Sequence, residues 1–238
     1  MHRDELVAQL TALHGAELVA VVLYGSAATD DHVSGHSDQN ILVIVESLGI
    51  ETLRAMAQTA RAWQEAGNPP PLMLTRREWL GSADVFPMEY ADILERHRVL
   101  AGVLPLDGVR VQVQDLRLQV EQEALGKLLR LRRAVMTAGA DVARQREVLR
   151  ASASALLVIL RSVLRLHGVV PPRDALEVIS AVATHTGIPA DPFQQTVRMV
   201  RGGALADAQV DAVVQGTLRG MEALTTHLDR FTAPGRSA

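Results

Sequence analysis

Two short apolar runs separated by a polar loop dominate the hydrophobic pattern in the first half of the chain. Residues 18–24 (LVAVVLY) and residues 41–45 (ILVIV) are rich in β-branched side chains and have the length of buried strands. The first run ends at Gly25-Ser26, and small and polar residues follow it. The pattern therefore predicts a strand, a loop or helical turn that begins with glycine, and a second strand.

The remaining pattern mixes helical spacing with short apolar segments in the first half and is helical throughout the second half. Glycine or proline residues separate successive elements. Helices are predicted over residues 4–14, 48–66, 116–137, 141–167, 173–186, 192–201 and 206–231, with further helix starts at Thr75 and near Pro87. Short strands are predicted over residues 72–74 and 97–101 and, from alternating valines, over residues 109–113.

This change, from mixed strands and helices in the first half to helices alone in the second, predicts two domains. A strand-and-helix domain covers residues 1–110, a bundle of long helices covers residues 111–232, and residues 233–238 form a flexible tail. The chain has 238 residues, which is enough for two modest domains. Hydrophobic residues make up 48% and aromatic residues only 3%, so we expect a core built from aliphatic side chains.

Composition also limits the partners. The formal net charge of -3 offers no general attraction to nucleic acid, and the shortage of aromatic residues argues against base stacking. The chain has no cysteine, which excludes disulfides and thiolate catalysis. Its N-terminus is charged, and no apolar run of about 18 residues exists, so we expect a cytoplasmic protein with no membrane partner.

The loop between the two predicted strands carries the candidate chemistry. Gly25 lets backbone N–H groups approach a ligand, because glycine has no side chain to block them. Asp38 and Asn40 are two residues apart at the start of a strand, so their side chains face the same side. Gly25-Ser26, a loop, and Ser37-Asp38 before an apolar strand resemble the signature of the nucleotidyltransferase superfamily, which includes DNA polymerase beta and kanamycin nucleotidyltransferase.

The resemblance implies a fold and a reaction. It implies an α+β protein, with a small mixed sheet flanked by helices and then an all-α helical bundle. It also implies metal-dependent transfer of a nucleotidyl group from a nucleoside triphosphate to an acceptor hydroxyl. In this family Mg²⁺ is held by an Asp-x-Asp pair and a third carboxylate on a neighbouring strand. Asp38 would then be the metal ligand, and Gly25, Ser26 and Ser37 would bind the nucleotide.

The chain departs from the family pattern at Asn40, where the family has a carboxylate. A neutral amide is a weaker ligand for Mg²⁺ than a carboxylate. The third carboxylate is expected beside residues 72–74, but that segment contains no acid. The nearest candidates follow it in the sequence: Glu78, Asp84, Glu89 and Asp92. The sequence therefore predicts weak Mg²⁺ binding at Asp38 and Asn40, and weakened or lost nucleotidyl transfer.

The first long helix of the second half carries a second candidate set. The resemblance implies a general base on the helical domain, for which Glu121 and Glu123 are rivals, and a lysine on the phosphates, for which Lys127 is the candidate. The structural alternative is that Glu123 and Lys127 form a surface ion pair, and that Glu121 pairs with Arg117 or Arg132.

Three functions stay open at this point. The first is a nucleotidyltransferase-like protein that binds a nucleotide, a small molecule or a partner in a cleft at Gly25, Ser26 and Asp38, with little or no transfer. The second is an active nucleotidyltransferase that modifies the hydroxyl of a small molecule or a protein. The third is a non-catalytic interaction protein that forms a homo-oligomer, in particular a dimer through the helical bundle.

Overall fold

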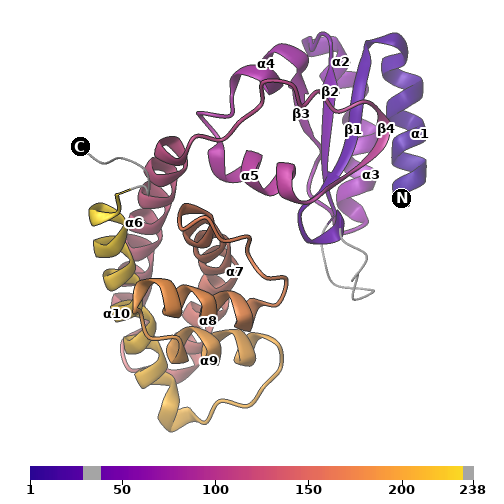
Figure 1. The fold of residues 1–238 in the computed structure, drawn as a ribbon. Coiled ribbons are helices and arrows are strands. Elements are labelled where there is room, and N and C mark those ends of the chain that lie inside the picture. The colour runs from indigo at the N-terminus through magenta and orange to yellow at the C-terminus, as the bar shows by residue number, and fades with distance from the viewer. Residues whose placement is uncertain (29–38, 233–238) are drawn as a thin grey trace. The chain divides into compact units, whose positions relative to one another are not determined.

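The computed structural model describes residues 1–28 and 39–232 of the chain (Figure 1). The chain separates into two compact units, Met1–Gln112 and Val113–Ala238. The first unit contains all of the strands found in the described residues, and the second contains only helices. Each unit has its own buried apolar core.

The first unit is built on a mixed sheet of four strands in the order β3-β2-β1-β4. β1 (Leu18–Tyr24) pairs antiparallel with both β2 (Asn40–Val45) and β4 (His97–Gly102). β3 (Leu72–Thr75) adds to the outer side of β2 in parallel. β1 and β2 are buried almost throughout, because their β-branched and leucine side chains fill both faces of the sheet. These strands confirm the predicted ones.

Helices cover both faces of this sheet. One face packs against α1 (Arg3–His14) and α3 (Ala57–Glu65), and the other against α4 (Arg76–Gly81) and α5 (Pro87–Glu95). Alternate residues of β2 belong to the two clusters, as the pleat of a strand requires. Even-numbered positions such as Leu42 therefore face α4 and α5.

Two predictions of secondary structure in this unit are wrong. The single helix predicted over residues 48–66 is two helices, α2 (Ile50–Ala55) and α3, which meet at a turn on the buried residue Met56. The strand predicted over residues 109–113 does not form. Val109 ends a turn and is buried against the sheet from a loop, so the alternation of valines reflects burial rather than strand pairing.

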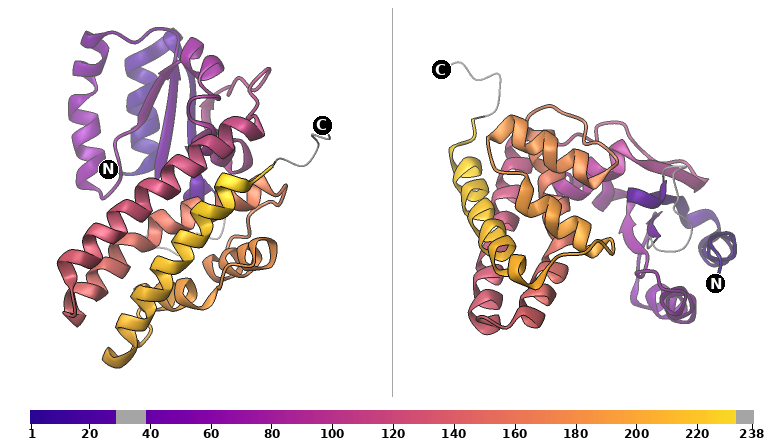
Figure 2. Two further views of the ribbon diagram at one scale, coloured as in Figure 1. Left: turned by 90° about the vertical axis from the view of Figure 1, so that its left-hand side faces the viewer. Right: turned by 90° about the horizontal axis from the view of Figure 1, so that it is seen from below.

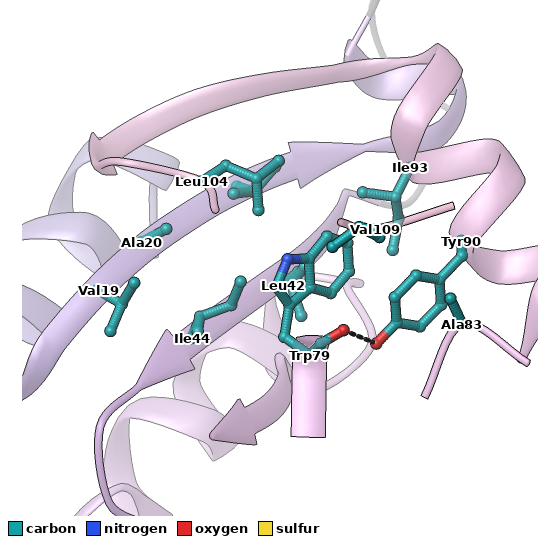
Figure 3. Close-up of a cluster of buried hydrophobic side chains, with 11 residues drawn as sticks. Val19, Ala20, Leu42, Ile44, Trp79, Ala83, Tyr90, Ile93, Leu104 and Val109 are labelled. Atoms are coloured by element: carbon teal, nitrogen blue, oxygen red, sulfur yellow. Dashed lines mark hydrogen bonds between the residues drawn. The ribbon is translucent and has the colours of Figure 1, made fainter. Parts of the chain in front are cut away.

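A pair of aromatic side chains joins α4 to α5 (Figure 3). The rings of Trp79 and Tyr90 stack with their centroids 4.5 Å apart, and the Tyr90 hydroxyl donates to the backbone oxygen of Trp79 at 2.8 Å. The indole N–H of Trp79 donates to the backbone oxygen of Pro105 at 2.6 Å. Burial raises the pKa of Tyr90 to about 12. These contacts fix α5 against the sheet.

The helix start predicted at Thr75 is present, and a capping box forms there. The backbone N–H of Glu78 donates to the Thr75 hydroxyl at 3.2 Å, and the Thr75 backbone N–H donates to the Glu78 carboxylate at 2.7 Å. The hydrogen bonds that its carboxylate accepts from Thr75 lower the pKa of Glu78. The box satisfies two backbone donors that the first turn of a helix leaves free.

We expect Thr75→Ala to lower the free energy of unfolding of the first unit by about 1 kcal/mol, because the N-cap hydrogen bond is lost. Thr75→Ser keeps the hydroxyl and should change it much less. Urea unfolding followed by tryptophan fluorescence reports this unit, because both tryptophans of the chain, Trp63 and Trp79, belong to it. Equal losses in the two variants would contradict a role for the cap.

The second unit is a helical bundle (Figure 2). Its described residues form α6 (Val113–Ala138), α7 (Val142–Leu166), α8 (Ala175–Thr186), α9 (Asp191–Val200) and α10 (Asp207–Arg230). Their bounds lie within about a turn of those predicted. α7 is the central helix, because it packs against each of the other four. Of the helices described here, none is long and apolar enough to cross a membrane.

Candidate active site

The candidate site is built where β1 ends. Gly25 follows the last residue of the strand with φ at +76°, a conformation that other residues adopt only with strain. It starts a short 3-10 turn over Gly25–Ala28, and its N–H donates to the backbone oxygen of Arg96 at 3.2 Å. The end of β1 lies beside the start of β2, where Tyr24 pairs with Asn40, and Gly25 reaches the residue that follows α5.

The side chains of Asn40 and Asp92 both lie next to Gly25. A β-carbon placed on Gly25 would be 3.4 Å from Asn40 Nδ2 and 3.5 Å from Asp92 Oδ2. Asn40 pairs with Tyr24 across β1 and β2, and as an even-numbered position it belongs to the face that α5 covers. An amide from the sheet and a carboxylate from α5 therefore meet beside a residue that has no side chain.

A second acid of α5 belongs to the same neighbourhood. Burial raises the pKa of Tyr24, and the negative charges of Asp92 and Glu89 raise it further. The Tyr24 hydroxyl therefore stays protonated at neutral pH and can donate a hydrogen bond. Tyr24 also pairs with His97 across β1 and β4, and His97 Nδ1 lies 2.8 Å from the backbone oxygen of Ile93. The phenol of Tyr24, the amide of Asn40 and the carboxylate of Asp92 therefore belong to the end of β1, and the charge of Glu89 acts on Tyr24 as well.

β3 carries no acid, as its sequence already showed. Of the four nearby acids named from the sequence, Asp92 is the one that lies next to Gly25. Glu78 is occupied in the capping box of α4. Tyr24 was missed by the sequence analysis. Its only signal is its position as the last residue of the strand before Gly25.

The remaining predicted residues of this site are not described. Ser37 and Asp38 lie outside the described residues, as does the side chain of Ser26. Among the described residues, no three side chains of His, Cys, Asp or Glu are grouped so that they could hold a metal ion. Asn40 and Asp92 alone would supply an amide oxygen and a carboxylate, which are acceptable but insufficient ligands for Mg²⁺.

The candidate residues of the second unit lie on α6. Glu121 forms an ion pair with Arg117 at 2.9 Å, as the structural alternative predicted. The ion pair proposed between Glu123 and Lys127 is absent from the described ion pairs. Lys127 instead lines a cavity of about 260 Å³ between α6, α7 and α10, together with Arg130 and apolar side chains such as Met221. This cavity has two cations at its wall and suits an anion with an apolar part.

The described residues have an α+β fold, in which a small mixed sheet flanked by helices is followed by an all-α bundle. The structure is similar to that of spectinomycin adenyltransferase AAD(9) from Enterococcus faecialis, solved with ATP and spectinomycin. The two match with a TM-score of 0.61 at 13% sequence identity, over 96% of this chain and 100% of that one. This likeness confirms the predicted fold class.

No family model matches the sequence, and no curated protein is similar to it at a significant level.

Proposed function

We propose that the first unit binds a nucleoside triphosphate together with Mg²⁺ at the end of β1, and that its nucleotidyl transfer is weakened or lost. The observation that carries the proposal is the meeting of Asn40 and Asp92 beside Gly25, where a backbone without a side chain can approach phosphates. The fold shared with an adenyltransferase solved with ATP supports the same assignment.

Asp92 and Asn40 would hold the metal, with Asp38 as the second carboxylate. Mg²⁺ prefers oxygen ligands and commonly uses one or two carboxylates together with the phosphates of the nucleotide. When bound, it would neutralise charge on the phosphates. Gly25 would leave room for the phosphates, and the protonated Tyr24 would donate a hydrogen bond to one of their oxygens.

The neutral side chain at position 40 is the reason to expect weak transfer. A carboxylate there would attract each metal ion with several kcal/mol more at an effective dielectric constant of about 20. Phosphoryl chemistry relies on positioning and on charge stabilisation, so the loss of a charged ligand acts directly on the reaction. Binding survives this loss better than transfer, because the phosphates themselves supply charge to the metal.

The contacts of the α6 residues favour some of the proposed roles over others. Glu121 is held by Arg117, which makes it a poor proton acceptor, so Glu123 is the better candidate for a general base. Lys127 and Arg130 are the candidate cations for phosphates or for an anionic acceptor. An active enzyme that modifies a hydroxyl remains the second candidate, and the carboxylate of Asp92 next to Gly25 supports it.

Calorimetric titration of the full chain with ATP and GTP tests the proposal. We expect binding in the presence of Mg²⁺ and at least tenfold weaker binding without it. Asp92→Asn should weaken the Mg²⁺-dependent binding about tenfold, equivalent to about 1.4 kcal/mol. Asp84→Asn, at an exposed acid between α4 and α5, is the matched control and should bind like the natural protein. Absence of binding, or equal losses in the two variants, would contradict the site.

A release assay separates the two candidate functions. If the protein transfers nucleotides, pyrophosphate should appear when Mg²⁺, a nucleoside triphosphate and hydroxyl-bearing acceptors are combined. Binding without pyrophosphate release would support the proposed weak or inactive form. Release that depends on Asp92 and Glu123 would instead support the active enzyme.

A further inference from the structure

Four large apolar side chains of α6 are exposed in a line. Leu118 is 63% exposed, Leu125 48%, Leu129 46% and Met136 82%. They are spaced by seven, four and seven residues. At 100° per residue this spacing keeps all four within about 20° of one line along the helix. We call this line the α6 stripe. It differs from the buried face of α6, which contains Leu116, Val120, Ala124, Leu128 and Leu131.

The α6 stripe is symmetric in the sequence. Leu118 and Met136 lie at equal distances on either side of Lys127, and so do Leu125 and Leu129. Two copies of α6 can lie antiparallel, with a two-fold axis between them at the height of residue 127 along the helix. Leu118 of each copy then meets Met136 of the other, and Leu125 meets Leu129. A two-fold interface requires a patch that is complementary to itself in this way.

One pair of charges beside the α6 stripe has nearly the same symmetry. Glu121 and Arg132 lie on the same side of it, about 40–60° away, and at nearly equal distances from residue 127. In the antiparallel arrangement Glu121 of one copy faces Arg132 of the other. Within each copy, Arg117 pairs with Glu121 at 2.9 Å and Arg132 pairs with Glu222 at 2.8 Å. Pairing two copies would therefore join these ion pairs into networks of alternating charge.

A parallel arrangement lacks this complementarity. The first half of α6 carries the acids Asp115, Glu121 and Glu123, and the second half carries only cations among its charged residues: Lys127, Arg130, Arg132 and Arg133. A parallel pair would place the basic half of one copy beside the basic half of the other. Opposed charges of this kind set the orientation of paired helices.

We propose that the α6 stripe is the interface of an antiparallel homodimer. The α6 stripe is about 27 Å long at 1.5 Å per residue. One pair of helices of this length buries less surface than a standard stable interface, so the dimer is a weak one, with a dissociation constant in the micromolar range. This inference rests on α6 alone and does not depend on nucleotide binding.

Sedimentation of the full chain over a range of concentrations tests self-association. We expect the mass to rise from 25.7 kDa towards twice that value as the concentration passes from about 1 to about 100 μM. Leu125→Glu should weaken the dimer at least tenfold. Val158→Glu, at an apolar residue of α7 that is 54% exposed, is the matched control and should leave it unchanged. A monomer at every concentration, or equal losses in the two variants, would overturn the proposal.

Cross-linking tests the orientation, because the chain has no cysteine of its own. In the proposed dimer, a mixture of the Leu118→Cys and Met136→Cys proteins should form a disulfide between the two different variants. Leu118→Cys alone should cross-link much less, since its two copies would lie at opposite ends of the interface. Efficient cross-linking of Leu118→Cys to itself would instead indicate a parallel pair and would overturn the antiparallel arrangement.

Discussion

Gly102→Ala is expected to lower the free energy of unfolding of the first unit by about 3–5 kcal/mol. Gly102 ends β4 with φ at +72°, which already costs a residue with a side chain about 1 kcal/mol. Its added β-carbon would also collide with the backbone of β1. It would overlap the backbone oxygen of Val19, lie 2.8 Å from the backbone carbon of that residue, and lie 3.1 Å from the Cα of Ala20. Backbone atoms in the middle of a sheet cannot move aside as a flexible side chain would.

Gly108→Ala separates the two causes. Gly108 has φ at +82°, but a β-carbon there would meet nothing within 4 Å. We therefore expect this variant to lose only about 1 kcal/mol, the cost of the backbone conformation. Urea unfolding of both variants, followed by tryptophan fluorescence, measures the difference. Similar urea midpoints for Gly102→Ala and Gly108→Ala would contradict a collision between the β-carbon added at position 102 and the backbone of β1.

The sequence predicted most elements of this fold because their signals are local. The strands at residues 18–24 and 41–45 follow from short runs of β-branched residues, and the helices of the second unit follow from periodicity. The start of α4 was likewise expected at Thr75. The failures have tertiary causes. Met56 turns into the core and divides a helix, and Val109 is buried against the sheet although it belongs to a loop. The residues around Met56 still show the spacing of a helix, and those around Val109 still show the alternation of a strand, so the sequence does not reveal either exception.

From the sequence alone, only those residues of the candidate site that lie at the ends of adjacent strands could be assigned to it. Gly25 and Asn40 are placed by the ends of β1 and β2, so a sequence pattern can identify them. Asp92 comes from α5, whose position depends on the packing of Tyr90 against Trp79. Sequence alone therefore left Asp92 as one of four acids. Glu121 illustrates the opposite case, because the sequence named Arg117 and Arg132 as its possible partners, and the ion pair forms with Arg117 at i, i+4 spacing.

Asn40→Asp is expected to make the first unit depend on metal for its stability. In the natural protein a neutral amide lies beside the carboxylate of Asp92, so the two can share this space without a cation. A second carboxylate would be repelled by Asp92. At an effective dielectric constant of about 20, this repulsion should cost about 1–3 kcal/mol in the absence of divalent ions. Mg²⁺ would remove the repulsion and would gain a charged ligand.

Two measurements check this expectation. Thermal unfolding followed by tryptophan fluorescence should show a larger increase in Tm on addition of Mg²⁺ for Asn40→Asp than for the natural protein. The reason is that an ion that binds only the folded state stabilises the folded state. Calorimetry should show Mg²⁺-dependent binding of ATP at least tenfold tighter in the variant. The double variant Asn40→Asp, Asp92→Asn is the control, and it should lose both gains.

The same comparison decides what Asn40 does in this protein. If the variant gains metal and nucleotide binding but the double variant does not, the two positions act on one metal, and Asn40 is what weakens the site. If Asn40→Asp responds to Mg²⁺ no more than the natural protein does, a carboxylate at position 40 does not meet Asp92 across a metal. The amide of Asn40 would then serve to bind a ligand that carries no metal. The hydrogen bonds of the amide, rather than its lack of charge, would determine which ligand binds at the end of β1.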